Sequence, residues 1–223
     1  MRVAVGAVAR KVLPKEISIK AGVVKMGEKE LPHDQRDWNA VYQNPLYCPD
    51  ISVVDDWENY LDDIRKSGSS IGAVVECRVS GVPAGWGAPV YNKIESQIAD
   101  AMMGINAVKG VEIGDGFGMV GPRGEDTLDQ IRMGDDGQPA FQSNHMGGVL
   151  GGITTGQDLI VRVAFKPTSS ILIPQKTIDL HGNETEIVTK GRHDPCVGLR
   201  GTPVVEAMMA CVLADQYLIK TAI

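Results

Sequence analysis

The sequence is poor in aromatic residues, which make up 5% of the chain, and it has no surplus of positive charge, since 22 Lys and Arg face 28 Asp and Glu. The formal net charge of -6 argues against a nucleic-acid partner, because binding to a phosphate backbone requires a basic surface. No apolar run approaches the roughly 20 residues that a membrane span requires, so we expect no membrane segment.

Cysteine is also scarce, and none of the four cysteines lies in a Cys-x-x-Cys pair. This spacing argues against a zinc site or a redox dithiol, and we predict no metal site. We expect reduced thiols, mostly buried, at Cys48, Cys77, Cys196 and Cys211. The first nine residues resemble the start of a signal peptide, but Arg10 and Lys11 interrupt the apolar run, so we expect a cytoplasmic protein.

Apolar spacing indicates helices interleaved with strands, which suggests an α+β or mixed α/β fold. We expect helices at 1–13, from Asp55 to Gly68, at 90–106, and from Pro203 onward as a first helical position. We expect strands at 16–26, 71–79, 159–165 and 170–174, and a hairpin of 177–180 with 185–189. The first helix opens without a capping residue, which hints that the natural chain continues upstream.

A tempting motif is the G-x-G-x-x-G of residues 116–121, which follows a short apolar run. A dinucleotide fingerprint requires a helix that opens at the third glycine, so that its N-terminus faces the pyrophosphate. Pro122-Arg123-Gly124 follows instead, without a helical apolar stripe. We therefore interpret the motif as a chance match in a glycine-rich region.

Three other stretches contain residues suited to an anionic ligand. Residues 143–152 contain two Gly-Gly pairs, which either let the backbone approach a flat or phosphorylated ligand or form a structural turn. Residues 166–170, Lys-Pro-Thr-Ser-Ser, place a cation beside three hydroxyls, although such a loop is often plain surface. Residues 191–196, Gly-Arg-His-Asp-Pro-Cys, gather a cation, an imidazole and a carboxylate, or form a loop salt bridge. We call them the glycine block, the Lys loop and the Arg-His-Asp turn, and we expect them to meet around one cavity for an anionic ligand.

These three stretches, in this order, resemble signatures of the chorismate synthase family. Residues 1–7, 87–90 and 104–112 also match, so the resemblance covers essentially the whole chain. It implies an α+β fold, a β-α-β sandwich with helices between antiparallel sheets, and a single domain over residues 1–223. It implies a homotetrameric lyase of aromatic amino-acid biosynthesis, which eliminates phosphate from 5-enolpyruvylshikimate 3-phosphate to give chorismate and requires reduced FMN without net redox change.

The resemblance also implies roles for individual residues. Asp194 would lie near the reactive ring of the flavin as part of a proton relay, and Arg192 would also touch the substrate. The residues implied to contact FMN are Asn106, Ala107, Gly151, Lys166, Thr168, Ser169, Ser170 and Arg192.

The family pattern also begins earlier than this sequence does. Its two site histidines, its early arginines and its Gly-Arg-Ser-Ser segment precede the position that Met1 matches. His33, His145 and His181 are not expected to replace those histidines. From the chain alone we therefore expect weak or absent catalysis, and two alternatives stay open: a non-catalytic flavin- or anion-binding protein, and a dinucleotide-binding oxidoreductase.

Overall fold

The computed structural model describes residues 1–135 and 137–222, and its centre is a five-stranded antiparallel sheet. The strand order is β2-β1-β3-β9-β4. The strands are β1 (Ser18–Met26), β2 (Lys29–Glu30), β3 (Ala73–Ser80), β4 (Val108–Ile113) and β9 (Leu159–Phe165).

The sheet forms because its strands alternate apolar and polar side chains. In β9, Leu159, Val161, Val163 and Phe165 are buried, while the residues between them are only half-buried. Successive side chains of a strand point to opposite faces, so one face of the sheet is apolar and the other polar. The apolar face is covered by helices, and the hydrophobic core lies between them and the sheet.

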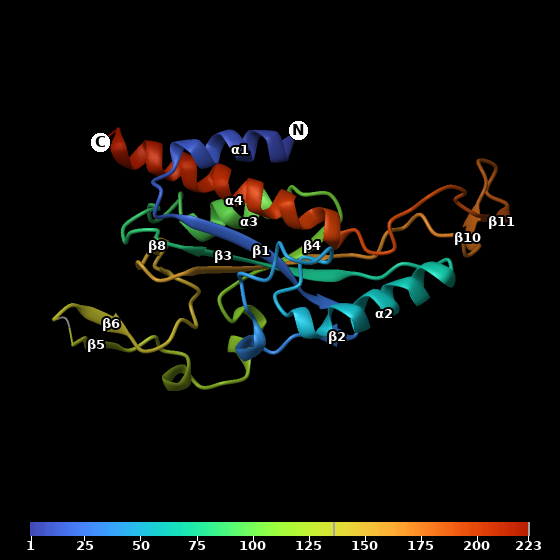
Figure 1. Cartoon of the computed structure of the whole chain (residues 1–223). Helices are drawn as coiled ribbons and strands as arrows, with labels where there is room; N and C mark the ends of the chain where they lie inside the picture. The colour runs from blue at the N-terminus through green and yellow to red at the C-terminus, as the bar shows by residue number, and fades with distance from the viewer. Residues whose placement is uncertain (136, 223) are drawn as a thin grey trace.

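Four α-helices complete the body: α1 (Arg2–Val12), α2 (Val54–Lys66), α3 (Ile94–Met103) and α4 (Gly198–Thr221). Figure 1 shows α4 lying along the sheet and α1 stacked on α4. The two helices approach closely at Gly6, where an added Cβ would lie 2.4 Å from the Cβ of Ala207. By length and composition α4 could cross a membrane, but 56% of its apolar window is buried inside the structure.

Short hairpins extend from this body (Figure 1). They are β5 (Ile131–Met133) with β6 (Pro139–Phe141) and β10 (Gln175–Ile178) with β11 (Glu184–Ile187), whereas the hairpin of β7 (Val149–Leu150) with β8 (Ile153–Thr154) packs against the body. The β10–β11 pair confirms the hairpin predicted there. Single 3₁₀ turns lie at His33–Gln35, Ile51–Val53, Gly116–Val120 and Gly124–Asp126.

Two predicted helix starts and one predicted strand were wrong. The helix expected from residue 90 begins at Ile94, because Ala88 and Asn92 pair through their backbones and hold the preceding turn outside the helix. Residues 170–174 form no strand, since one backbone bond, from Leu172 N to Gly68 O, holds them to a loop. The last helix begins at Gly198, so Pro203 lies inside it. There a proline removes one hydrogen bond near the helix start.

The fold class and the state of the cysteines agree with what the sequence predicts. Antiparallel sheets packed with separate helices confirm the α+β class. All the cysteines are unpaired, and burial raises the pKa of each thiol. Cys48, Cys77 and Cys196 are buried and Cys211 is half-buried, as predicted.

Candidate functional site

The Lys loop and the Arg-His-Asp turn lie against each other at one end of the sheet. The Thr168 hydroxyl donates a hydrogen bond to the main-chain oxygen of Asp194 at 2.9 Å. From the segment after α2, the Ser70 hydroxyl donates to the main-chain oxygen of Thr168 at 2.6 Å, and Ile71 N donates to Pro195 O at 2.8 Å. These bonds join three segments that are far apart in the sequence.

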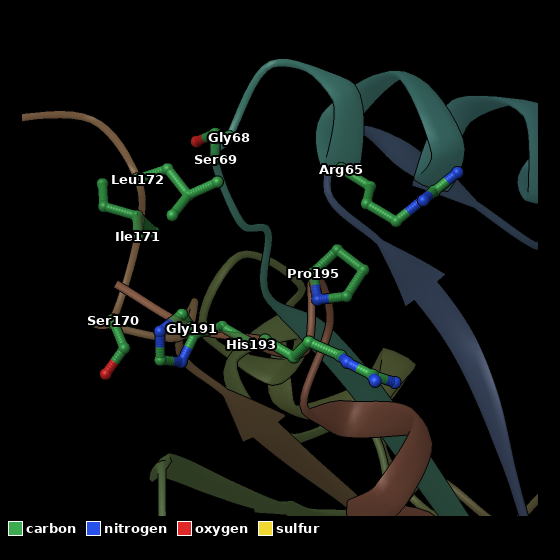
Figure 2. Close-up of a pocket in the computed structure, with 10 residues that line it drawn as sticks. Arg65, Gly68, Ser69, Ser170, Ile171, Leu172, Gly191, His193 and Pro195 are labelled. Atoms are coloured by element: carbon green, nitrogen blue, oxygen red, sulfur yellow. The ribbon is translucent and has the colours of Figure 1, made fainter. Parts of the chain in front are cut away.

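A cavity of about 260 Å³ lies where these segments meet (Figure 2). Its guanidinium groups, Arg65 and Arg192, and the hydroxyls of Ser69 and Ser170 suit a phosphate or carboxylate. Gly191 in its wall has φ of 132°, a conformation that other residues rarely adopt. The full lining is Arg65, Gly68, Ser69, Ser170, Ile171, Leu172, Gly191, Arg192, His193 and Pro195.

A second cavity, of about 460 Å³, lies beside the start of α4. Its walls are mainly apolar, and Asn106, Arg2 and Arg200 supply the polar groups. Arg200 Nε donates to Asp194 Oδ1 at 2.8 Å, so the Asp194 carboxylate is held by a residue of this cavity. The apolar lining is Met1, Val3, Ile105, Phe165, Val197, Gly201 and Val204.

A contact between Ala107 and Lys166 holds the turn after α3 against the Lys loop. Lys166 N donates to Ala107 O at 2.9 Å, and Ala107 has φ of 69°, which is uncommon for a residue other than glycine. The Lys166 ammonium donates to the Ser169 hydroxyl within its own loop. Because this bond joins exposed side chains, the ammonium can exchange the hydroxyl for an anionic ligand.

The glycine block lies elsewhere. Gly148 N donates a hydrogen bond to the Asn144 side chain, and Gly152 O accepts one from Ile94 N at the start of α3. The block adjoins the beginning of β9, whereas Lys166 follows its end. Seven strand residues span about 20 Å. Of the three stretches expected around one cavity, the chain therefore brings two together, and Gly151, which is exposed, stays apart from them.

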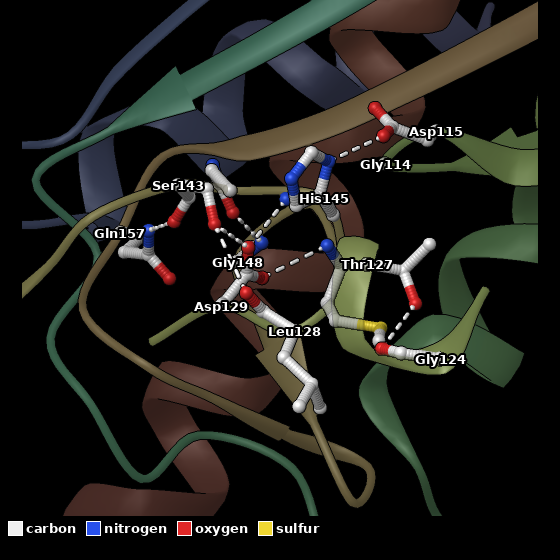
Figure 3. A network of polar contacts seen from close by, with 12 residues as sticks. Gly114, Asp115, Gly124, Thr127, Leu128, Asp129, Ser143, His145, Gly148 and Gln157 are labelled. Atoms are coloured by element: carbon white, nitrogen blue, oxygen red, sulfur yellow. Dashed lines mark hydrogen bonds and ion pairs between the residues drawn. The ribbon is translucent and has the colours of Figure 1, made fainter. Parts of the chain in front are cut away.

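The glycine block is instead built around a carboxylate (Figure 3). Asp129 accepts hydrogen bonds from the Ser143 hydroxyl and from the backbone N–H groups of His145 and Met146. Burial acts to raise the pKa of Asp129, but these hydrogen bonds outweigh it and lower the pKa below its ordinary value. The His145 ring contacts Asp115 at 2.6 Å. Sequence reasoning missed Asp129, which lies in an irregular segment without a recognisable motif.

Two negative predictions concern residues outside these loops. The G-x-G-x-x-G segment forms a 3₁₀ turn at Gly116–Val120 and then another at Gly124–Asp126, so the helix that a dinucleotide site requires does not follow it. Within the described residues, no group of three or more His, Cys, Asp or Glu side chains is placed to hold a metal ion.

Comparison with known proteins identifies the family. Residues 1–218 match the family model described as chorismate synthase. The chain belongs to the chorismate synthase family. It is 58% identical over 217 residues to the chorismate synthase of Caulobacter vibrioides and 59% identical over 220 residues to that of Rhodospirillum centenum, in each case over 97% of this chain.

The fold of the chorismate synthase family agrees with this assignment. A solved structure described as the crystal structure of chorismate synthase superposes with a TM-score of 0.81 and 32% identity, and the match covers 98% of this chain and 62% of that one. The chain spans 58% of the length of the two curated relatives. The fold predicted from the resemblance is thus that of the family.

Proposed function

We propose that this chain carries the part of a chorismate synthase that binds reduced FMN and holds Asp194 near its ring. The proposed reaction is the 1,4-elimination of phosphate from 5-enolpyruvylshikimate 3-phosphate to give chorismate. A ring C–H bond and the C–O bond to phosphate break, a proton passes to a base, and phosphate leaves. We further propose a cytoplasmic protein whose 223 residues are part of one chorismate synthase domain.

One observation carries this proposal: two backbone-anchored contacts gather the implied cofactor residues at one edge of the sheet. Lys166 N bonds to Ala107 O, and Thr168 Oγ1 bonds to Asp194 O. Arg192 lines the smaller cavity, and Asn106 lines the larger one. Six residues from three separate segments of the chain would not share one edge if each segment were only a surface turn.

The chemistry of this edge fits FMN. The larger cavity is about 460 Å³ and mainly apolar, which suits a flat ring system, and ligand pockets commonly range from about 300 to 1,000 Å³. Lys166, Arg192 and the hydroxyls of Thr168, Ser169 and Ser170 are suited to polar and anionic groups of the cofactor or the substrate. When bound there, reduced FMN would supply electron density for the departure of phosphate, without net redox change.

Asp194 is the group that we propose as a proton carrier. Its Oδ1 accepts from Arg200 Nε, whereas its Oδ2 accepts no hydrogen bond within the described part of the chain. Arg200 is a positioning residue, which fixes the direction of the carboxylate without touching the reacting atoms. Arg192 remains a proposed contact for both FMN and the substrate phosphate, since it lines the smaller cavity.

Gly151 bears on the proposed homotetramer. It lies at the opposite end of β9 from Lys166, about 20 Å of strand away, so the two residues are poorly placed to contact one flavin within a single chain. We propose that Gly151 reaches the cofactor of a second copy. The exposed apolar residues of α1, Val3, Val5 and Val8, would face further protein in the β-α-β sandwich of this family.

An anaerobic assay tests the reaction. The 223-residue chain, alone and extended at its N-terminus with the upstream segment of a curated relative, is mixed with reduced FMN and 5-enolpyruvylshikimate 3-phosphate, and chorismate is measured. FMN binding is measured separately by quenching of flavin fluorescence. Turnover in the extended form with FMN binding in both supports the proposal. Absence of turnover and of FMN binding in both forms contradicts it.

A second candidate function is FMN binding without turnover. It is favoured because the chain spans only 58% of the length of its curated relatives. The same assay separates the candidates. In the extended form, Asp194→Asn is expected to lower turnover at least about a hundredfold, as for a group in proton transfer, with little change in FMN affinity. Equal losses of both would mean that Asp194 holds the cofactor and does not move a proton.

A further inference from the structure

A second group of cationic side chains lies on the polar face of the sheet, opposite the face that α4 covers. Ser18 and Lys20 of β1 are directly opposite Ser80 and Arg78 of β3. The intervening Ile19 is buried in the core, so these four side chains lie on the other face. The register therefore places a pair of hydroxyls beside a pair of cations.

Trp38 and Asp158 close this group into a cavity of about 240 Å³. Trp38 belongs to the loop between β2 and α2, which is fixed to the sheet by an ion pair of 2.6 Å between Arg36 and Glu76, both almost fully buried. The Trp38 Nε1–H is shielded from solvent and has no hydrogen-bond partner among the described residues. The indole forms a flat wall of the cavity.

The charge of the cavity is unbalanced. Arg78 pairs with Asp158 through Nε at 2.8 Å. Lys20 donates to the neutral side-chain oxygen of Asn39 at 2.8 Å and forms no ion pair with a carboxylate in the described part of the chain. Two cations thus face one carboxylate, which leaves an excess positive charge in a protein whose net charge is -6. An anion is the ligand that this excess would attract.

We propose that this cavity binds a small organic anion, a flat ring that carries one carboxylate or phosphate group. Lys20 and the Arg78 guanidinium would hold the anionic group, because charge-assisted hydrogen bonds are the strongest such contacts, and Ser18 and Ser80 would add hydroxyl donors. The ring would lie against Trp38, since stacking on an indole is favourable for flat groups.

This site is separate from the proposed cofactor edge. β3 begins at Ala73, close to the Lys loop, and ends at Ser80, so its eight residues place the cavity about 20 Å from that edge. The cavity instead adjoins the glycine block, because the main-chain oxygen of Asp158 accepts a hydrogen bond from Asn144. An anion bound in this cavity would therefore contact β1, β3 and the segment that holds the glycine block.

Calorimetric titration of the 223-residue chain with benzoate, phenyl phosphate and inorganic phosphate, at constant ionic strength, tests the proposal. We expect saturable one-to-one binding of benzoate or phenyl phosphate at millimolar concentration or below, and the tighter of the two identifies the anionic group. Inorganic phosphate and neutral benzamide should bind at least about tenfold more weakly, because each lacks one half of the recognised ligand. Equal binding of benzamide, or no saturable binding of either ring anion, overturns the proposal.

Substitutions then locate the site. Lys20→Gln should weaken binding at least about tenfold, whereas Lys15→Gln, an exposed lysine just before β1, should leave it unchanged. Trp38→Phe should keep a flat wall and retain binding but lose the ligand-dependent change in tryptophan fluorescence. Ser80→Ala gives a second, milder test if Lys20→Gln unfolds. Unchanged affinity in Lys20→Gln or Ser80→Ala, or displacement of the anion by FMN, overturns a separate site.

Discussion

The hydroxyl of Thr168 donates a hydrogen bond to the main-chain oxygen of Asp194, and this contact fixes the Lys loop to the Arg-His-Asp turn. Ser70 extends the connection, because its hydroxyl donates to the main-chain oxygen of Thr168 from the segment that follows α2. The candidate cofactor edge thus depends on a serine that no cofactor contact was expected to include.

Replacement of Ser70 by Ala should loosen the Lys loop without removing any proposed FMN contact. The lost hydrogen bond contributes about 1 kcal/mol, so we expect FMN affinity to fall up to about fivefold. Fluorescence titration with FMN measures the change. The control is Ser67→Ala, whose hydroxyl bonds to Ile64 at the end of α2, and it should bind FMN normally. Unchanged affinity in Ser70→Ala would show that the bond does not organise the loop.

Glu206 joins α4 to three other parts of the molecule. Its carboxylate accepts hydrogen bonds from Arg10 at 2.8 Å, from Ala21 N at 2.7 Å and from the Tyr42 hydroxyl, and its side chain is 12% exposed. Burial first, and then the hydrogen bond to Glu206, raise the pKa of Tyr42 well above its ordinary value of 10.0.

Glu206→Gln should lower the free energy of unfolding by about 1–2 kcal/mol, because its three donors lose a charged acceptor, while solvent screens the partly exposed Arg10. Denaturant titration measures this loss. The pKa of Tyr42 should also fall toward 10.0 in a spectrophotometric titration, since the carboxylate that favours its protonated form is gone. The exposed Glu58→Gln on α2 should change stability by less than about 0.5 kcal/mol. A similar change in both variants would contradict the assigned role of Glu206.

Gly6 permits the close contact between α1 and α4. In an exposed helix, Gly→Ala stabilises by about 1 kcal/mol, but here the new Cβ would meet Ala207 at 2.4 Å. We therefore expect Gly6→Ala to reduce the free energy of unfolding by about 1–3 kcal/mol. Thermal unfolding measures this change in stability. The control is Gly121→Ala, because no heavy atom lies within 4 Å of its added Cβ. Stabilisation by Gly6→Ala would mean that the helices separate without cost.

An element was predictable from sequence where its own residues alternate between buried and more exposed positions. β9 was predicted with its observed bounds, Leu159–Phe165, because it alternates buried and half-buried side chains over its full length. The start of α4 was not, because Pro203 signals a first helical position, whereas the helix begins where Gly198 packs against Ala73 of the sheet. That contact is tertiary and leaves no local mark in the sequence.

The candidate site was predictable in part for the same reason. The motifs identified Lys166, Thr168 and Asp194, which are close neighbours in space. Their separation from Gly151 follows from the length of β9 and from its antiparallel pairing, which a list of motifs in chain order does not contain. The register of β1 with β3, which aligns Lys20 with Arg78, is likewise visible only in the folded chain.

The Asp129 carboxylate should make the glycine block sensitive to acid. Burial raises its pKa, but hydrogen bonds from Ser143, His145 and Met146 outweigh burial and lower the pKa below 3.8. Its stabilising effect is therefore complete above that value and disappears as pH falls through the lowered pKa. Asp129→Asn should therefore be about 1 kcal/mol less stable at neutral pH, a value limited by solvent screening, and should converge with the wild type in acid. Thermal unfolding across a pH series measures both. The exposed Asp34→Asn should match the wild type throughout, and a pH-independent deficit in Asp129→Asn would mean that shape, and not charge, holds the block together.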